Sequence, residues 1–173
     1  MKKTIIFIMI IILSACSKPV EQSMTAIKVS EIDGDRLWER ISEEADYETY
    51  SFWPDHEGIQ PGQSPHGTYH RIFINKILAE DLPSKDLILP EGSIIVKENL
   101  DSEKSLDAIT VMVKVKDYNP DAGDWFWAKY TPEGEVLAEG TPGGCIGCHE
   151  GMDENDYIIV RPLDLETGLN PNS

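Results

Sequence analysis

One stretch of the chain alternates strictly between two kinds of side chain. Every second position from 109 to 115 is β-branched and apolar: Ile109, Val111, Val113 and Val115. The positions between and after them hold Thr110, Met112, Lys114 and Lys116. Because successive side chains of a strand point to opposite faces, the alternation predicts a half-buried strand. Met112 on the nominally polar face indicates that something apolar covers part of that face, the alternative being an ordinary packed methionine.

Shorter stretches predict the strands around this one. The candidates are residues 69–74, 93–99, 125–130 and 135–138, and the turn sequences Pro90-Glu91-Gly92 and Pro132-Glu133-Gly134 introduce or join them. Consecutive strands with short turns predict an antiparallel sheet. The expected fold is therefore mainly β, of the α+β class, with a few helices packed on the sheet.

The remaining segments predict helices and a loop. Leu37, Trp38 and Ile41 have helical spacing, so an amphipathic helix is expected over 35–45, with Asp33 or Asp35 available as its N-cap. A helical turn is expected over 76–81. The segment 53–67 is dense in proline and glycine and is expected to be a loop.

Length and charge narrow the class of protein. With 173 residues, 40% of them hydrophobic, the chain is long enough for one domain with a sizeable core. Its net charge of −16 gives a surface that repels phosphate backbones. A nucleic acid is therefore not an expected partner.

The N-terminus has the pattern of an export signal. Lys2 and Lys3 precede an apolar run, residues 5–13, that is too short to span a bilayer. The run ends in Leu13-Ser14-Ala15-Cys16, which looks like a bacterial lipobox and predicts lipid attachment at Cys16. The alternative is an ordinary signal peptide with an incidental cysteine.

These features predict the organisation and location of the chain. We expect a lipoprotein signal peptide over 1–15, a lipid-anchored flexible tether over 16–30 and one folded domain over 31–173. The protein is expected outside the cytoplasm, held by its lipid to the periplasmic side of a membrane. In a Gram-negative host, Ser17 beside the anchor favours the outer membrane.

The motif that carries chemistry is Cys145-Ile146-Gly147-Cys148-His149. C-x-x-C-H is the attachment motif of c-type haem. Each thiol adds to one vinyl group of the porphyrin, and the adjacent His149 is held under the iron as its ligand. The motif thus predicts one covalent haem c in the folded domain. The alternatives are a C-x-x-C disulfide, a redox dithiol in a βαβ context, or half of a zinc site.

The motif supplies one axial ligand, so the other face of the iron is open to several candidates. These are the remaining histidines and two methionines: His56, His66, His70, Met112 and Met152. Met152 follows His149 by three residues and is therefore tethered to the proximal side.

Several segments together resemble the cytochrome P-460 family of mono-haem c proteins. They are Pro65-His66-Gly67, then Arg71, then 90–98, then Gly123-Asp124-Trp125-Phe126-Trp127, and then the C-x-x-C-H motif. The resemblance covers roughly residues 35–161. It implies a mostly antiparallel β fold, a homodimer, and haem on one face of the sheet. Characterised members oxidise hydroxylamine, and the related cytochromes c′-beta bind nitric oxide.

The resemblance also implies a role for Lys97. The family has a lysine in a G-x-x-x-x-K-E pattern that is bonded to the porphyrin edge, and Lys97 matches it in the segment 92–98. From the residues alone, Lys97 is either an inward-facing side chain or a charged residue that protects an edge strand.

The chain departs from the family at Met112. Hydroxylamine-oxidising members place a carboxylate on the corresponding strand as proton acceptor, and a thioether cannot accept a proton in this way. Lys97 and Met112 are thus the candidate catalytic residues, and the alternative proton acceptors are Asp107, Glu98 or a chain of water molecules.

Two functions follow as expectations. The first is redox chemistry on a small nitrogen compound, hydroxylamine or nitric oxide, with electrons passed to another cytochrome. The second is a non-catalytic protein that carries electrons or binds a gas, with Met112 as a weak ligand or apolar lid.

Overall fold

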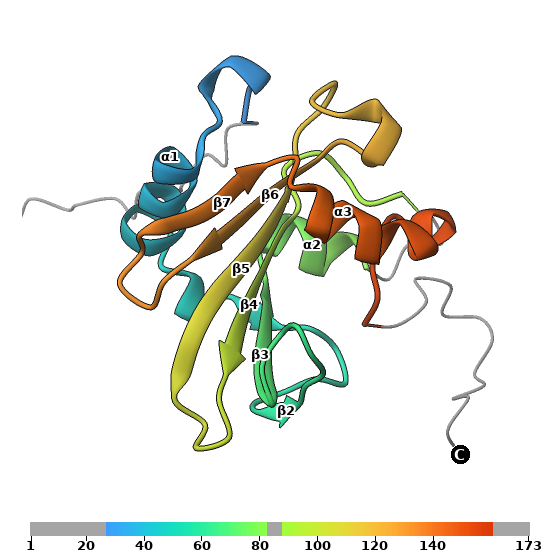
Figure 1. Ribbon diagram of the computed structural model, residues 1–173. Helices are drawn as coiled ribbons and strands as arrows, with labels where there is room; N and C mark the ends of the chain where they lie inside the picture. The colour runs from blue at the N-terminus through green and yellow to red at the C-terminus, as the bar shows by residue number, and fades with distance from the viewer. Residues whose placement is uncertain (1–26, 83–87, 161–173) are drawn as a thin grey trace, which may run out of the picture.

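An antiparallel sheet forms the centre of the computed structural model, which describes residues 27–82 and 88–160 (Figure 1). Within these residues it has seven strands: β1 (Ser51–Phe52), β2 (Gln60–Pro61), β3 (Tyr69–Ile74), β4 (Ile94–Leu100), β5 (Leu106–Lys114), β6 (Trp125–Tyr130) and β7 (Val136–Gly140). Their order is β1-β3-β4-β5-β6-β7, and β2 pairs with β3. The predicted antiparallel α+β fold is confirmed.

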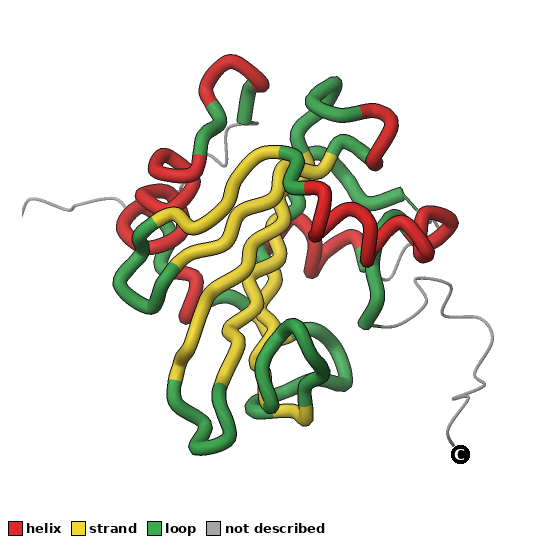
Figure 2. Tube along the Cα trace, in the orientation of Figure 1, coloured by secondary structure: helices red, strands yellow, loops and turns green. Residues whose placement is uncertain are grey.

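The helices lie on both sides of the sheet (Figure 2). They are α1 (Gly34–Glu39), α2 (Lys76–Asp81) and α3 (Gly143–His149). A π-helical turn (Arg40–Glu44) continues α1, and 3₁₀ turns occupy Val29–Glu31, Tyr47–Thr49, Pro120–Ala122 and Glu150–Asn155. Asp33 caps α1 as predicted, because its carboxylate accepts a hydrogen bond of 2.7 Å from the backbone N–H of Arg36.

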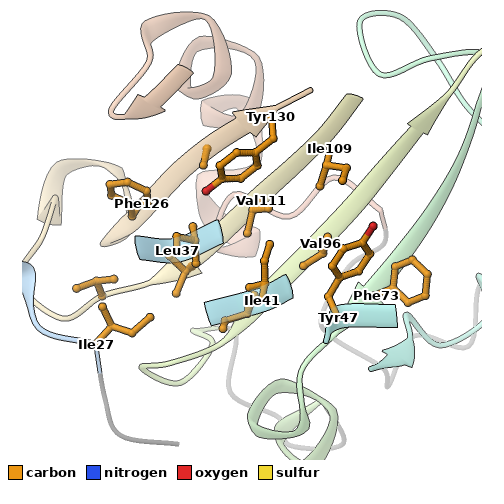
Figure 3. Close-up of a cluster of buried hydrophobic side chains, with 14 residues drawn as sticks. Ile27, Leu37, Ile41, Tyr47, Phe73, Val96, Ile109, Val111, Phe126 and Tyr130 are labelled. Carbon is orange, nitrogen blue, oxygen red and sulfur yellow. The ribbon is translucent and has the colours of Figure 1, made fainter. Parts of the chain in front are cut away.

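The first face of the sheet carries an apolar core (Figure 3). Leu37 of α1 and Ile41 of the following turn pack over Val96, Val111 and Phe126 of the three central strands. The predicted amphipathic helix is therefore confirmed, and its apolar side covers this face.

The second face is also buried, which the alternation over 109–116 did not predict. Met112 and Lys114 are only 9% and 7% exposed, so the prediction of a half-buried strand is wrong for this part of β5. On this face Met112 belongs to one apolar cluster with Trp125 and Trp127 of the neighbouring β6 and with Leu78 of α2. The apolar cover that Met112 indicated is confirmed.

Lys114 is tolerated in this core because it has a charged partner. Its ammonium group bonds to the carboxylate of Asp156 and lies 4.9 Å from the centre of the Trp125 ring. Asp156 also accepts a hydrogen bond from the N–H of Leu89 at 2.9 Å. The pair therefore ties the chain after α3 to the middle of the sheet.

The first residue that the structure describes belongs to the core on the first face of the sheet. Ile27 is buried in the first core, and the 3₁₀ turn Val29–Glu31 follows it. The signal peptide and Cys16 lie outside the described residues. Among the helices that the structure describes, none is long and apolar enough to cross a membrane.

The buried pair predicts a stability loss for Asp156→Asn. Asparagine fits the left-handed backbone of this position, where φ is 51°, but it leaves Lys114 without a counter-charge. We expect the free energy of unfolding to fall by about 3–5 kcal/mol, measured by urea denaturation of the purified protein.

Glu154→Gln is the matched control, since it removes one charge from an exposed position two residues away. A loss in Asp156→Asn that is no larger than in this control would contradict the role of the pair.

Candidate functional site

All four histidines of the chain line one cavity on the second face of the sheet. His56 and His66 come from the segment between β1 and β3, His70 from β3 and His149 from the end of α3. The cavity measures about 570 Å³, which is within the range of cofactor pockets. Segments that are far apart in the sequence thus place imidazoles around a common space.

Helix α3 brings the three residues of the C-x-x-C-H motif to this cavity. Cys145, Cys148 and His149 are spaced i, i+3 and i+4, and all three line the cavity. Cys145 is half-buried and Cys148 is exposed, and the two are not joined to each other. Both thiols are therefore available to a group in the cavity.

The His149 ring is oriented by its backbone partner. Its Nδ1 lies 2.7 Å from the carbonyl oxygen of Tyr157, which only accepts hydrogen bonds, so Nδ1 donates and Nε2 keeps its lone pair. Burial lowers the pKa of His149 below its usual value, and this also favours the neutral, ligating form. The Trp127 ring packs against the imidazole with its centre 4.7 Å away. His149 thus presents one free nitrogen in a fixed direction.

The turn that supplies this carbonyl has an unusual backbone. Asp156 and Tyr157 both have positive φ, 51° and 67°, which reverses the chain after the 3₁₀ turn. The backbone carbonyl of Asp156 accepts a hydrogen bond of 3.0 Å from Trp125 Nε1, and its carboxylate holds Lys114. The Lys114–Asp156 pair therefore also fixes the partner of His149.

The floor of the cavity is formed by the central strands. Lys97 and Met112 both line it, Lys97 from β4 and Met112 from β5. Because β4 lies between β3 and β5, the hypothesis that Lys97 protects an edge strand is wrong. Burial lowers the pKa of Lys97 to about 8, so its amine is uncharged more often than that of a surface lysine.

Neither alternative proton acceptor is at the cavity. The Glu98 side chain is on the opposite face, where it binds the Tyr47 hydroxyl and the Arg71 guanidinium. Asp107 is exposed and does not line the cavity. Among the described residues that line the cavity, none is an aspartate or a glutamate. Met152 is not among them either.

Several residues of the site were not anticipated. Trp53, Thr110 and Trp127 also line the cavity, and Asn99 binds His66 from the end of β4. Strand parity could have indicated Asn99, because it is two residues beyond Lys97 and so lies on the same face. No sequence signal marks Tyr157, since it contributes a backbone oxygen.

The cavity carries buried polar atoms that have no protein partner. Six such side-chain atoms occur in the described residues, and five belong to residues that line the cavity: Trp53 Nε1, His56 Nδ1, both ring nitrogens of His70, and Trp127 Nε1. Unpaired buried groups are costly, so a bound molecule with acceptor atoms is expected here. Haem has an apolar ring and two carboxylates, and it fits this donor set and the two free thiols.

The alternative hypotheses for the C-x-x-C pair find little support. In the described residues, no group of three or more His, Cys, Asp and Glu side chains is arranged to hold a metal ion, so a zinc site gains no further ligands there. The strand pairs recorded in the described sheet are antiparallel, unlike the βαβ context of a thioredoxin-like dithiol.

The helix with the C-x-x-C-H motif lies over an antiparallel sheet, with the cavity between them. This arrangement is typical of a protein that binds c-type haem. The family described as cytochrome P-460 matches residues 38–160, and the chain belongs to this family. It is therefore a c-type haem protein, and the predicted resemblance over 35–161 is confirmed. A separate comparison with curated proteins found no match.

Proposed function

We propose that this protein is a lipid-anchored, mono-haem c-type cytochrome that binds or oxidises a small nitrogen compound and passes electrons to another cytochrome. Hydroxylamine and nitric oxide are the candidate ligands. The observation that carries the proposal is the cavity beside the C-x-x-C-H helix, because it has free thiols, an oriented imidazole and unpaired polar atoms around one space.

Cys145, Cys148 and His149 hold the haem in this proposal. Each S–H would add across one vinyl group, so that sulfur bonds to carbon and the hydrogen goes to the neighbouring carbon, with no net oxidant. His149 Nε2 would bind the iron while Nδ1 keeps its bond to Tyr157. The bound haem supplies an iron that exchanges single electrons and accepts a small ligand.

Met112 limits proton transfer in the proposed reaction. It lines the cavity where a proton acceptor would be useful, and its thioether is too weak a base. Lys97 lines the same floor, and its lowered pKa leaves more of its amine as the free nucleophile that a bond to the porphyrin edge would need. Replacing a ring C–H by a C–N bond would release two protons and two electrons, which an external oxidant such as peroxide would accept.

A second candidate function is electron transfer or gas binding without turnover. The absence of Asp and Glu from the described cavity lining favours it, since these are common proton acceptors. The two functions share one haem site and differ in whether substrate protons are removed.

The location and assembly of the protein belong to the same proposal. Lipid on Cys16 would hold the domain at the periplasmic side of a membrane, close to other exported cytochromes. A homodimer is proposed from the family resemblance alone.

Replacing both thiols, in Cys145→Ser with Cys148→Ser, should abolish covalent haem. Serine cannot form the thioether, so haem should be lost on denaturing electrophoresis, where the wild-type band stains for haem. Ile146→Ala is the control, because it leaves the motif intact and should still stain. Full covalent haem in the double variant would refute the attachment.

Lys97→Ala should change the absorption spectrum without releasing haem. A bond between this lysine and the ring distorts the porphyrin and moves its bands to the red, so the variant should show an ordinary c-type spectrum. Lys129→Ala is the matched control, because Lys97, Thr110 and Lys129 follow one another across β4, β5 and β6, yet Lys129 does not line the cavity. Identical spectra for wild type and Lys97→Ala would exclude the crosslink.

Met112→Glu should raise the rate of hydroxylamine oxidation. A positioned base contributes about a hundredfold to ten-thousandfold, so even part of this effect is measurable in a steady-state assay. Met112→Gln is the control, because glutamine has the shape of glutamate and is also polar but cannot act as the base. Equal rates in the two variants would show that the lack of a base at this position does not limit turnover.

A further inference from the structure

Two of the four histidines, His66 and His149, lie close together at the cavity. The ring centres of His66 and His149 are 6.3 Å apart, and the ring planes are nearly perpendicular, at 89°. Imidazoles that bind one metal ion from opposite sides have ring centres about 6–6.5 Å apart, because each metal–nitrogen bond is about 2.0–2.1 Å. The spacing of this pair therefore suits two axial ligands of one iron.

His66, like His149, has an oxygen partner at its Nδ1 atom. Its Nδ1 lies 3.3 Å from Oδ1 of Asn99. The Asn99 amide nitrogen donates to the carbonyl oxygen of Ala108 at 3.1 Å and to Thr110 Oγ1 at 3.3 Å, so its oxygen is the acceptor left for His66. His66 Nδ1 accordingly carries the proton and Nε2 keeps its lone pair. A ligating histidine typically has such a partner on its second nitrogen.

The backbone around His66 is held on both sides. Its N–H donates to Gln63 O at 2.9 Å, and Gly62 N–H donates to Thr68 O at 2.8 Å. Gly67 has φ of 77° and lies so close to the end of β4 that a Cβ atom would be 2.5 Å from Leu100 O. Glycine is therefore required here, and the loop carries His66 in a defined position.

The other candidate ligands are less suited. His56 and His70 stack nearly parallel, 20° apart, and both nitrogens of His70 and Nδ1 of His56 have no partner to fix a tautomer. Met112 is packed in the second core with Ile95 and Trp127, and nothing orients its sulfur toward an axial position.

We propose that His66 is the second axial ligand of the haem iron in the resting protein, and that a small nitrogen ligand binds by displacing it. In this step the His66–iron bond breaks and one bond from the new ligand forms, with no net change of electrons. The inference depends on the proposed haem site.

The test uses the purified holoprotein in its ferric state. We expect optical and electron paramagnetic resonance spectra of a low-spin iron with two nitrogen ligands. His66→Ala should convert the iron to high spin, and added imidazole should restore the low-spin spectrum. Met112→Leu and His70→Gln are the controls and should remain low-spin.

The outcomes separate this inference from the haem proposal. Wild type without covalent haem would refute the haem site itself. Covalent haem with a high-spin, five-coordinate iron would refute only the role of His66 as a ligand. The same role would be refuted if Met112→Leu or His70→Gln became high-spin while His66→Ala stayed low-spin.

Ligand binding provides a second readout. A ligand that must displace His66 meets only the fraction of molecules in which His66 has dissociated. Ferrous His66→Ala should therefore bind nitric oxide about tenfold faster or more, measured by stopped-flow absorption. Equal binding rates in wild type and variant would overturn the displacement.

Discussion

The hydrogen bond from His149 Nδ1 to the Tyr157 carbonyl is the interaction on which the site depends. It fixes the tautomer of the proximal imidazole and the direction of its free nitrogen. The carbonyl is in place because Asp156 and Tyr157 adopt positive φ, and because Lys114 and Trp125 bind Asp156. A buried ion pair between β5 and the turn at Asp156 therefore supports the position of the proposed iron ligand.

The two faces of the sheet differ in what they carry. One face is covered by α1 and carries an apolar core, with Glu98 satisfied by Tyr47 and Arg71 at its margin. The other carries the cavity, and its polar groups are left unpaired in part. Both faces thus contribute buried apolar residues to stability, while the second face also keeps donors and thiols free for a bound group.

The strands and the motif could be predicted from sequence because both depend on local spacing. Alternation located β5, turn residues separated the strands, and C-x-x-C-H indicated haem. Local spacing does not give the neighbours of each strand, so it does not decide between an inward-facing and an edge position for Lys97, and it places Lys114 on a polar face. The convergence of His66 on His149 depends on the loop beside β4, and no local pattern records it.

The central claim is that one haem fills the cavity with its iron on His149. The most direct measurement is a crystal structure of the mature holoprotein with the anomalous signal of iron. The account predicts one iron peak bonded to His149 Nε2, with porphyrin density continuous with the sulfurs of Cys145 and Cys148 over the β4–β5 face. An iron bound elsewhere, or a Cys145–Cys148 disulfide beside an empty cavity, would contradict it.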